Sequence, residues 1–297
     1  MTVIRDLKSV NDFIVYEILM RSRFINNPET MSIASSRIYI ATYYNHTLDL
    51  WNPTKAIRTV HSTPDLTIIK VECNYQGGIA LTDTGKVIFF THTERLIYHT
   101  DEFITDISSS EKDLIMTTLS GQFIRMGKRG GYLKTSRSPL SVSVGSAKIA
   151  YITCGHLYMG EVLIPHKLPI VQVSVGGGHT IFLDVEGGLY GFGCNKKGQL
   201  GRGLIEYAHR PVKLPFWTEV KKIVAGNEHT VILDTKGDAW MCGVINDKRV
   251  GLKAQTVDDC LYGFFRFRGK ILDVSTNSNM TFLLHFNGDI EQLGGCT

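Results

Sequence analysis

The sequence has no long apolar run. No stretch approaches the roughly 18 consecutive apolar residues that a membrane-spanning helix needs, although 43% of the 297 residues are hydrophobic. The first residues, MTVIRDLKSVNDF, include Asp6 and Asp12 where a secretory signal peptide needs an apolar core. We therefore expect an intracellular protein, cytoplasmic or nuclear, with no membrane span.

Cysteine is scarce and irregularly spaced. The six cysteines form no C-x-x-C pair, which disfavours zinc sites and redox centres. Without a secretory signal, reduced thiols are the default. The sequence also lacks H-E-x-x-H, a Ser-His-Asp arrangement and a paired-carboxylate motif. We expect no catalytic residue, no metal site, no cofactor and no enzyme activity, although catalytic residues scattered over loops would leave no motif.

One glycine-rich stretch comes close to a nucleotide-binding motif. Residues 193–200, GCNKKGQL, match the pattern G-x-x-x-x-G-K-[ST] except at Gln199 and Leu200. The missing Lys would neutralise phosphate and the missing hydroxyl would hold Mg²⁺, so this loop is a turn. Downstream, Gly203 and Pro211 interrupt the helix that such a motif would open. We expect these glycines to serve the fold.

The chain repeats itself. Residues 171–193 align without a gap on residues 221–243 at a shift of 50, and residues 272–294 align next. Four weaker copies precede these. The seven copies are aligned on one position each, which we call the anchors: Arg37, Gly77, Asp113, Ala147, His179, His229 and Met280.

Each copy has the pattern of a meander of short strands. Apolar and other residues alternate in HTIFLDVEGGLYGFG, and the EGG and TKGD turns favour positive φ. Seven units in 297 residues give about 42 residues per unit, which is a propeller-blade period. We predict an all-β, seven-bladed propeller over residues 31–297, preceded by an N-terminal segment, residues 1–30.

The last copy lacks an outer strand of its own, because the chain stops three residues after Gly294. An apolar stretch, FIVYEIL at 13–19, has no other assignment. We expect it to pair with the sheet that contains residues 272–294 and to close the ring.

One copy carries a specific motif. The stretch GGGHTIFLDVEGGLYGFGCNKKGQLGRG resembles the repeat of the regulator of chromosome condensation (RCC1) family, the RCC1-like seven-bladed propellers. The matching residues are Gly176, His179, Thr180, Leu183, Gly187, Tyr190, Gly193, Asn195, Gly198, Gln199, Leu200, Gly201 and Gly203. A second copy keeps the first half of the motif and loses the G-Q-L-G tail, and the other five match only in spacing.

The resemblance implies two functional classes. Some RCC1-like proteins are guanine-nucleotide exchange factors for small GTPases, and the founding type acts on Ran at chromatin, whereas many others are interaction platforms. This sequence departs from the family because five of its seven anchors are not histidine and because it has no basic N-terminal tail for chromatin. The contact residues of the exchange factors cannot be placed on it.

The repeat positions are expected to be structural. A catalytic or metal pair of His179 and His229 would need further converging ligands, and the spacing supplies none. Instead, a buried histidine would donate a hydrogen bond to a backbone carbonyl and order a turn. The structural set is Gly176, His179, Gly187, Gly193, Gly226, His229, Gly237, Gly243, Gly288 and Gly294.

Two segments are not explained by the repeat. Residues 114–160 hold no Asp or Glu, so this stretch is either a solvated loop and strand edge or a basic face for an acidic partner. In LYGFFRFRGK at 261–270, alternation predicts one aromatic face and one basic face, which fits either an edge strand on its blade or a hot spot. The candidate partner-binding residues are Arg125, Lys128, Arg129, Lys134, Arg137, Tyr262, Phe264, Phe265, Arg266, Phe267 and Arg268.

The sequence thus favours a protein-interaction scaffold or adaptor subunit built on an RCC1-like propeller. The alternative is an exchange factor for a Ran-like or Rab-like small GTPase, and the second alternative is association with chromatin or nucleic acid. The modest net charge of +4 makes nucleic acid the weaker expectation. If the two segments above are not the contact surface, the loops around Lys196, Lys197 and Arg202 are the next candidates.

Overall fold

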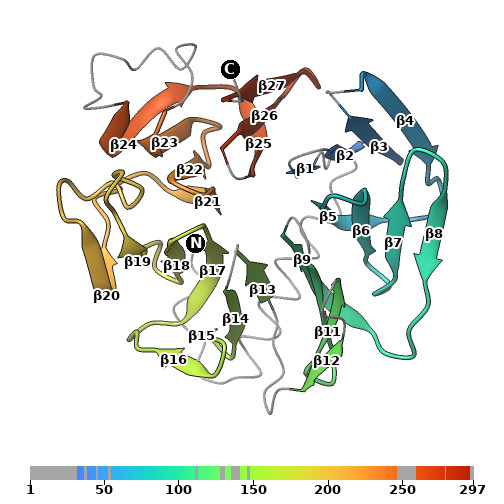
Figure 1. The fold of residues 1–297 in the computed structure, drawn as a ribbon, viewed down its shortest axis with the longest axis horizontal. Coiled ribbons are helices and arrows are strands. Elements are labelled where there is room, and N and C mark those ends of the chain that lie inside the picture. Colours follow the sequence, from blue (N-terminus) through green and yellow to red (C-terminus); the bar gives the residue numbers. More distant parts are fainter. Residues whose placement is uncertain are drawn as a thin grey trace.

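The protein is a ring of seven antiparallel sheets (Figure 1). The computed structural model describes residues 32–294 apart from residues 37–38, 45, 53–54, 111–112, 128–130, 135–140, 146–147, 246–258 and 278. In these residues every regular element is a β-strand, and no helix in this part of the chain is suited to crossing a membrane. The predicted all-β, seven-bladed propeller is confirmed.

Six blades are four-stranded meanders, and the seventh has three strands within the described residues. The first three blades comprise β1 (Ser32–Ser35), β2 (Ile40–Tyr44), β3 (Thr47–Asn52), β4 (Ile57–Ser62); β5 (Ile68–Cys73), β6 (Gly78–Thr82), β7 (Val87–Phe90), β8 (Arg95–Tyr98); β9 (Ile104–Ser109), β10 (Asp113–Thr118), β11 (Gln122–Gly127), β12 (Gly131–Lys134). The fourth and fifth comprise β13 (Ser141–Val144), β14 (Ile149–Thr153), β15 (His156–Met159), β16 (Val162–Ile164); β17 (Ile170–Val175), β18 (His179–Asp184), β19 (Leu189–Cys194), β20 (Tyr207–Lys213). The last two comprise β21 (Val220–Ala225), β22 (His229–Asp234), β23 (Ala239–Val244), β24 (Cys260–Arg268); β25 (Ile271–Thr276), β26 (Thr281–His285), β27 (Ile290–Leu293).

The seven predicted repeats correspond to the seven blades. The second strand of each blade begins at its predicted anchor or shortly after it, and Asp113, His179 and His229 are the first residues of β10, β18 and β22. The first strand of each blade lies nearest the centre of the ring (Figure 1). Consecutive first strands contact each other around the ring, and β1 also contacts β25, so the first and last blades meet.

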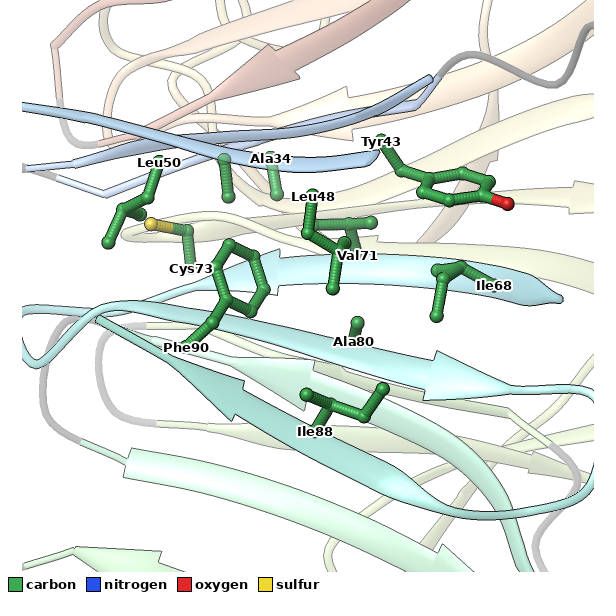
Figure 2. Close-up of a cluster of buried hydrophobic side chains, with 11 residues drawn as sticks. Ala34, Tyr43, Leu48, Leu50, Ile68, Val71, Cys73, Ala80, Ile88 and Phe90 are labelled. Carbon is green, nitrogen blue, oxygen red and sulfur yellow. The ribbon is translucent and has the colours of Figure 1, made fainter. Parts of the chain in front are cut away.

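The core is divided among the blade interfaces. Each of seven clusters of buried apolar side chains draws on two neighbouring blades. Figure 2 shows the cluster between the first two blades, in which Leu48 and Leu50 of β3 face Val71 of β5 and Phe90 of β7. Strands such as β6 and β18 are buried along their whole length, so their central residues, 79–81 and 181–183, are apolar, and the buried polar residues at their ends need partners.

Polar side chains on the innermost strands tie each blade to the next. The third residue of the first strand is Asp106 in the third blade and Asp273 in the seventh. Asp273 accepts hydrogen bonds from Lys222 Nζ of the sixth blade at 2.6 Å and from the backbone N–H of Ile33 in the first blade at 3.0 Å. This carboxylate therefore links three blades across the point where the ring closes.

Asp106 repeats the same arrangement elsewhere in the ring. It accepts hydrogen bonds from Lys70 Nζ of the second blade and from the N–H of Val142 in the fourth, each at 2.9 Å. In the fifth blade the equivalent residue, Gln172, also accepts a backbone N–H from the following blade. Ser143 of the fourth blade does the same from the position that corresponds to Ser174 of the fifth. Because an inner strand cannot form a ladder with its neighbour in the next blade, these side chains satisfy its backbone groups instead.

The predicted pairing of residues 13–19 with the last blade lies outside the described residues and stays a prediction. The predicted boundary at residue 30, between the N-terminal segment and the propeller, also lies outside the described residues and stays a prediction. If the pairing exists, deletion of residues 1–20 exposes an unpaired sheet edge, and such edges promote aggregation. We expect the deletion variant to aggregate in size-exclusion chromatography while the full chain elutes as a discrete species. A soluble deletion variant with an unchanged elution volume and melting temperature would count against the pairing.

Candidate functional site

The predicted basic segment is only partly placed by the structure. Arg125 lies on β11 and forms an ion pair with Asp113 of β10 at 2.7 Å, because the antiparallel register makes the two residues diagonal neighbours on one face. Arg125 therefore has a carboxylate partner, which lies one residue before the stretch that lacks Asp and Glu. Lys134 is the last residue of β12, and the remaining candidates lie outside the described residues: Lys128, Arg129 and Arg137.

The predicted aromatic segment forms β24, the outermost described strand of the sixth blade. Its aromatic side chains do not share one face. Phe264 is buried against the fifth blade, whereas Phe267 is buried toward the seventh and Phe265 packs there half-buried. The expected single aromatic face is wrong because Phe264 and Phe265 are consecutive residues, and consecutive side chains of a strand point to opposite faces of the sheet.

The basic residues of β24 are paired within the chain. Arg266 contacts Asp238 at 2.7 Å, and Arg268 contacts Glu291 of β27 at 2.7 Å. The guanidinium of Arg268 lowers the pKa of the Glu291 carboxyl through hydrogen bonding. Arg268 thus joins the sixth blade to the seventh. Of the candidate partner-binding residues in this segment, only Tyr262 lines the groove described below.

The glycine-rich stretch of the fifth blade is a loop that packs on β24. Asn195 organises it, because its side-chain amide donates to the carbonyls of Gly203 and Ile205 while its Oδ1 accepts the N–H of Leu200. A Cβ at Gly198 would collide with the carbonyl of Leu261, and this residue has a φ of +79°. The glycines therefore allow close packing between blades, as the sequence suggested, and they hold no phosphate-binding motif.

An open groove lies between the fifth and sixth blades, beside this loop. Its volume is about 820 Å³. Three stretches line it: the loop at 201–203, the segment at 213–217 that leads from β20 toward β21, and Tyr262 with Gly263 of β24. Tyr262 donates its hydroxyl to the carbonyl of Lys196 at 3.3 Å, which ties the loop to this strand.

The groove combines exposed aromatic and basic side chains. Trp217 is 72% exposed, although its ring is held by Phe216, with ring centroids 6.3 Å apart, and by Trp240 at 5.7 Å. Arg202 donates to the carbonyl of Lys213, and these two are the charged residues of the described lining. The sequence pointed to the loop at Arg202 as a second choice and missed Trp217, for which the only signal was its place in a segment between repeats.

The two repeat histidines are buried and connect neighbouring blades. His179 Nε2 lies 2.8 Å from the hydroxyl of Thr230, and His229 Nε2 lies 3.1 Å from the hydroxyl of Thr281. The expected structural role fits this placement, but the partner is a hydroxyl of the next blade and not a backbone carbonyl. The Thr230 hydroxyl itself donates to the carbonyl of Gln199, so its oxygen accepts the Nε2–H of His179.

The glycines three residues before each histidine make room for its ring. A Cβ at Gly176 or at Gly226 would collide with the imidazole of His179 or of His229. Gly187, Gly237 and Gly288 adopt positive φ at the turns between second and third strands, and Gly193, Gly243 and Gly294 do so further along each repeat. No cluster of three or more potential metal-ligating side chains occurs in the described part of the chain.

Comparison with known proteins identifies the repeat. Two models of the regulator of chromosome condensation (RCC1) repeat match the chain, one over residues 186–233 and the other over residues 170–199 and 220–248. The regulator of chromosome condensation of Xenopus laevis is 28% identical over 152 residues, which are 47% of this chain and 36% of that protein. The ultraviolet-B receptor UVR8 of Arabidopsis thaliana is 32% identical over 135 residues, 41% of this chain and 30% of the receptor.

Solved structures share the fold. Prp20p from Saccharomyces cerevisiae superposes with a TM-score of 0.69 at 13% identity, over 89% of this chain and 82% of Prp20p. Human WBSCR16 gives a TM-score of 0.67 at 12% identity, over 91% of this chain and 88% of that one. The fold and the repeat together define a seven-bladed β-propeller of the RCC1 type. The chain thus carries RCC1 repeats over part of its length and is similar to RCC1-like proteins. It spans about a third of the length of the regulators of chromosome condensation that it matches.

Proposed function

We propose that this protein is an intracellular interaction scaffold or adaptor subunit with no catalytic activity of its own, and that it holds a partner protein on the rim of the propeller. The observation that carries the proposal is the groove between the fifth and sixth blades. It presents Trp217, which is 72% exposed, beside Arg202 and Lys213. Tryptophan and arginine are among the residues that most often dominate binding energy at protein interfaces.

Exchange of guanine nucleotide on a Ran-like or Rab-like small GTPase is the second candidate. Its support comes from relatives. A murine RCC1-like G exchanging factor-like protein is 31% identical over 94 residues, 30% of this chain and 20% of that protein. The structure of Prp20p was described together with its binding to Gsp1p and histones. Association with chromatin or nucleic acid is a third possibility and rests on the same comparison.

One pair of measurements separates these functions. The tagged full chain is expected to capture a reproducible set of proteins from its native cells, and it is expected to leave the release of labelled GDP from a panel of Ran-like and Rab-like GTPases unchanged. Accelerated GDP release from any of these GTPases would show that the protein acts as an exchange factor, and the scaffold proposal would be wrong. Binding to duplex DNA that falls by orders of magnitude between about 50 and 200 mM salt would favour the nucleic-acid alternative.

A further inference from the structure

The position of Trp217 is fixed although its surface is exposed. The ring packs edge-on against Trp240, with an angle of 81° between the two planes, and lies beside Phe216. Phe216 in turn contacts Phe264 of β24, with ring centroids 5.3 Å apart. An aromatic ring that is already held by its neighbours loses little conformational entropy when a partner covers it. Trp217 is therefore a preorganised contact point.

The charge of the groove has one sign. Within the described lining, Arg202 and Lys213 are the charged residues, and both are positive. Lys196 and Lys197 are exposed on the same loop, and the bond between the Lys196 carbonyl and Tyr262 fixes that loop against the groove. Positively charged surfaces attract segments of opposite charge, so the complementary partner is acidic.

The lining also leaves room for a second backbone. Of its three glycines, Gly203 faces open space, because a Cβ added there would meet nothing within 4 Å, whereas a Cβ at Gly201 would collide with the ring of Phe264. Gly203 has a φ of +68° and donates its N–H to the carbonyl of Tyr262, which holds this open stretch of loop in place. Open backbone at Gly203, in the same groove as the fixed ring of Trp217, suits an extended chain more than the convex face of a folded domain.

We propose that the groove between the fifth and sixth blades binds an extended acidic segment of a partner protein, which lays a large apolar side chain on Trp217 and places carboxylates beside Arg202 and Lys213. The inference rests on the proposed scaffold function and names the chemistry of the partner. The apolar side chain supplies most of the affinity, because it buries the exposed ring, and the carboxylates supply orientation and a faster association rate.

The test uses a displayed library of random peptides of about twelve residues, selected on the full-length chain. We expect enrichment of peptides with Asp or Glu on both sides of Trp, Phe or Leu. For the best peptide, synthesised with a fluorophore, we expect Trp217→Ala to weaken binding at least about tenfold. Lys213→Glu should weaken it several-fold and reduce its dependence on salt.

Two matched variants serve as controls, one for each kind of change. Phe286→Ala removes another aromatic side chain, which is 63% exposed in the seventh blade, and Lys236→Glu reverses another exposed charge. Both should bind the peptide within about twofold of the wild type. Failure to enrich any peptide, enrichment of neutral or basic peptides, or equal binding by Trp217→Ala and the wild type would overturn the inference.

Two further results distinguish how the inference could fail. If labelled single-stranded dT20 binds the wild type and is lost in Trp217→Ala while no acidic peptide binds, the groove is a nucleic-acid site and the peptide inference is wrong. If the variant with both Trp217→Ala and Lys213→Glu still captures every native partner of the wild type, the scaffold function stands and the groove is not its contact surface. If the wild type captures no partner, the scaffold function itself is wrong.

Discussion

Replacing Asp273 with Ala is expected to lower the free energy of unfolding by about 3 kcal/mol or more. Removal of one partner of a buried ion pair typically costs about 3–5 kcal/mol. The substitution leaves Lys222 Nζ and the N–H of Ile33 without their acceptor. The exposed fraction of the Lys222 side chain is 33%, so water partly compensates the lysine. Ile33 is only 2% exposed, so its N–H has no such replacement.

Chemical denaturation of purified variants measures this effect. Asp289→Ala removes an exposed carboxylate of the same blade and should change stability by less than about 0.5 kcal/mol. Asp106→Ala breaks the equivalent link among the second, third and fourth blades and should cost about as much as Asp273→Ala. In a double-mutant cycle, Lys222→Met should add little to Asp273→Ala because the pair is already broken. Equal stability of the Asp273 and Asp289 variants would show that this carboxylate does not hold the ring.

The repeat could be predicted because the residues that define it recur at fixed, short distances along the sequence. His179 and His229 begin the second strands of their blades, and the glycines that follow occupy turns with positive φ. Even blades without the histidine kept the order of strand, turn and strand, so the anchor at Asp113 fell on the first residue of β10. Local backbone geometry constrains the residue types at these positions, and that constraint survives divergence.

The contacts between blades could not be predicted in the same way. Asp273 and Ile33 are 240 positions apart, and nothing in either local sequence marks the pair. The aromatic residues of β24 were misjudged for a different reason. Phe264 and Phe265 are adjacent in the chain, so strand alternation sends them to opposite faces, one against the fifth blade and one toward the seventh. Trp217 escaped notice because the repeat alignment does not show which residues between two copies come to line a groove.

Acidification is expected to destabilise the fold below about pH 6.5 through the two buried histidines. Burial lowers the pKa of His179 to about 3 and that of His229 to about 4, from an ordinary value of 6.5. A second cause acts on His179, because a positive charge on His229 would repel its own. Its Nδ1 has no hydrogen-bond partner, so protonation would create a buried donor without an acceptor.

The direction in which stability changes with pH follows from proton uptake by the unfolded chain. Between pH 6.5 and about 4 the unfolded chain binds protons at these two positions while the folded chain does not, so stability falls as the pH falls. Each histidine contributes about 1.4 kcal/mol per pH unit in this window. From pH 7 to pH 5 the two together should remove about 4 kcal/mol, and above pH 7 their contribution is fully present.

Denaturation free energies at pH 7 and pH 5 test this for the wild type and for variants that cannot titrate. His229→Gln retains a donor for Thr281 and should reduce the loss on acidification by about 2 kcal/mol. The same change at His179 should have the same effect. Between pH 7 and pH 5 the double variant should therefore lose little free energy of unfolding through these two positions. His229→Ala also loses the hydrogen bond and should cost about 1–3 kcal/mol at pH 7 without altering partner binding per folded molecule. His99 is exposed, so His99→Gln should leave the pH dependence unchanged. If the double variant is as acid-sensitive as the wild type, these imidazoles are not held neutral between the blades.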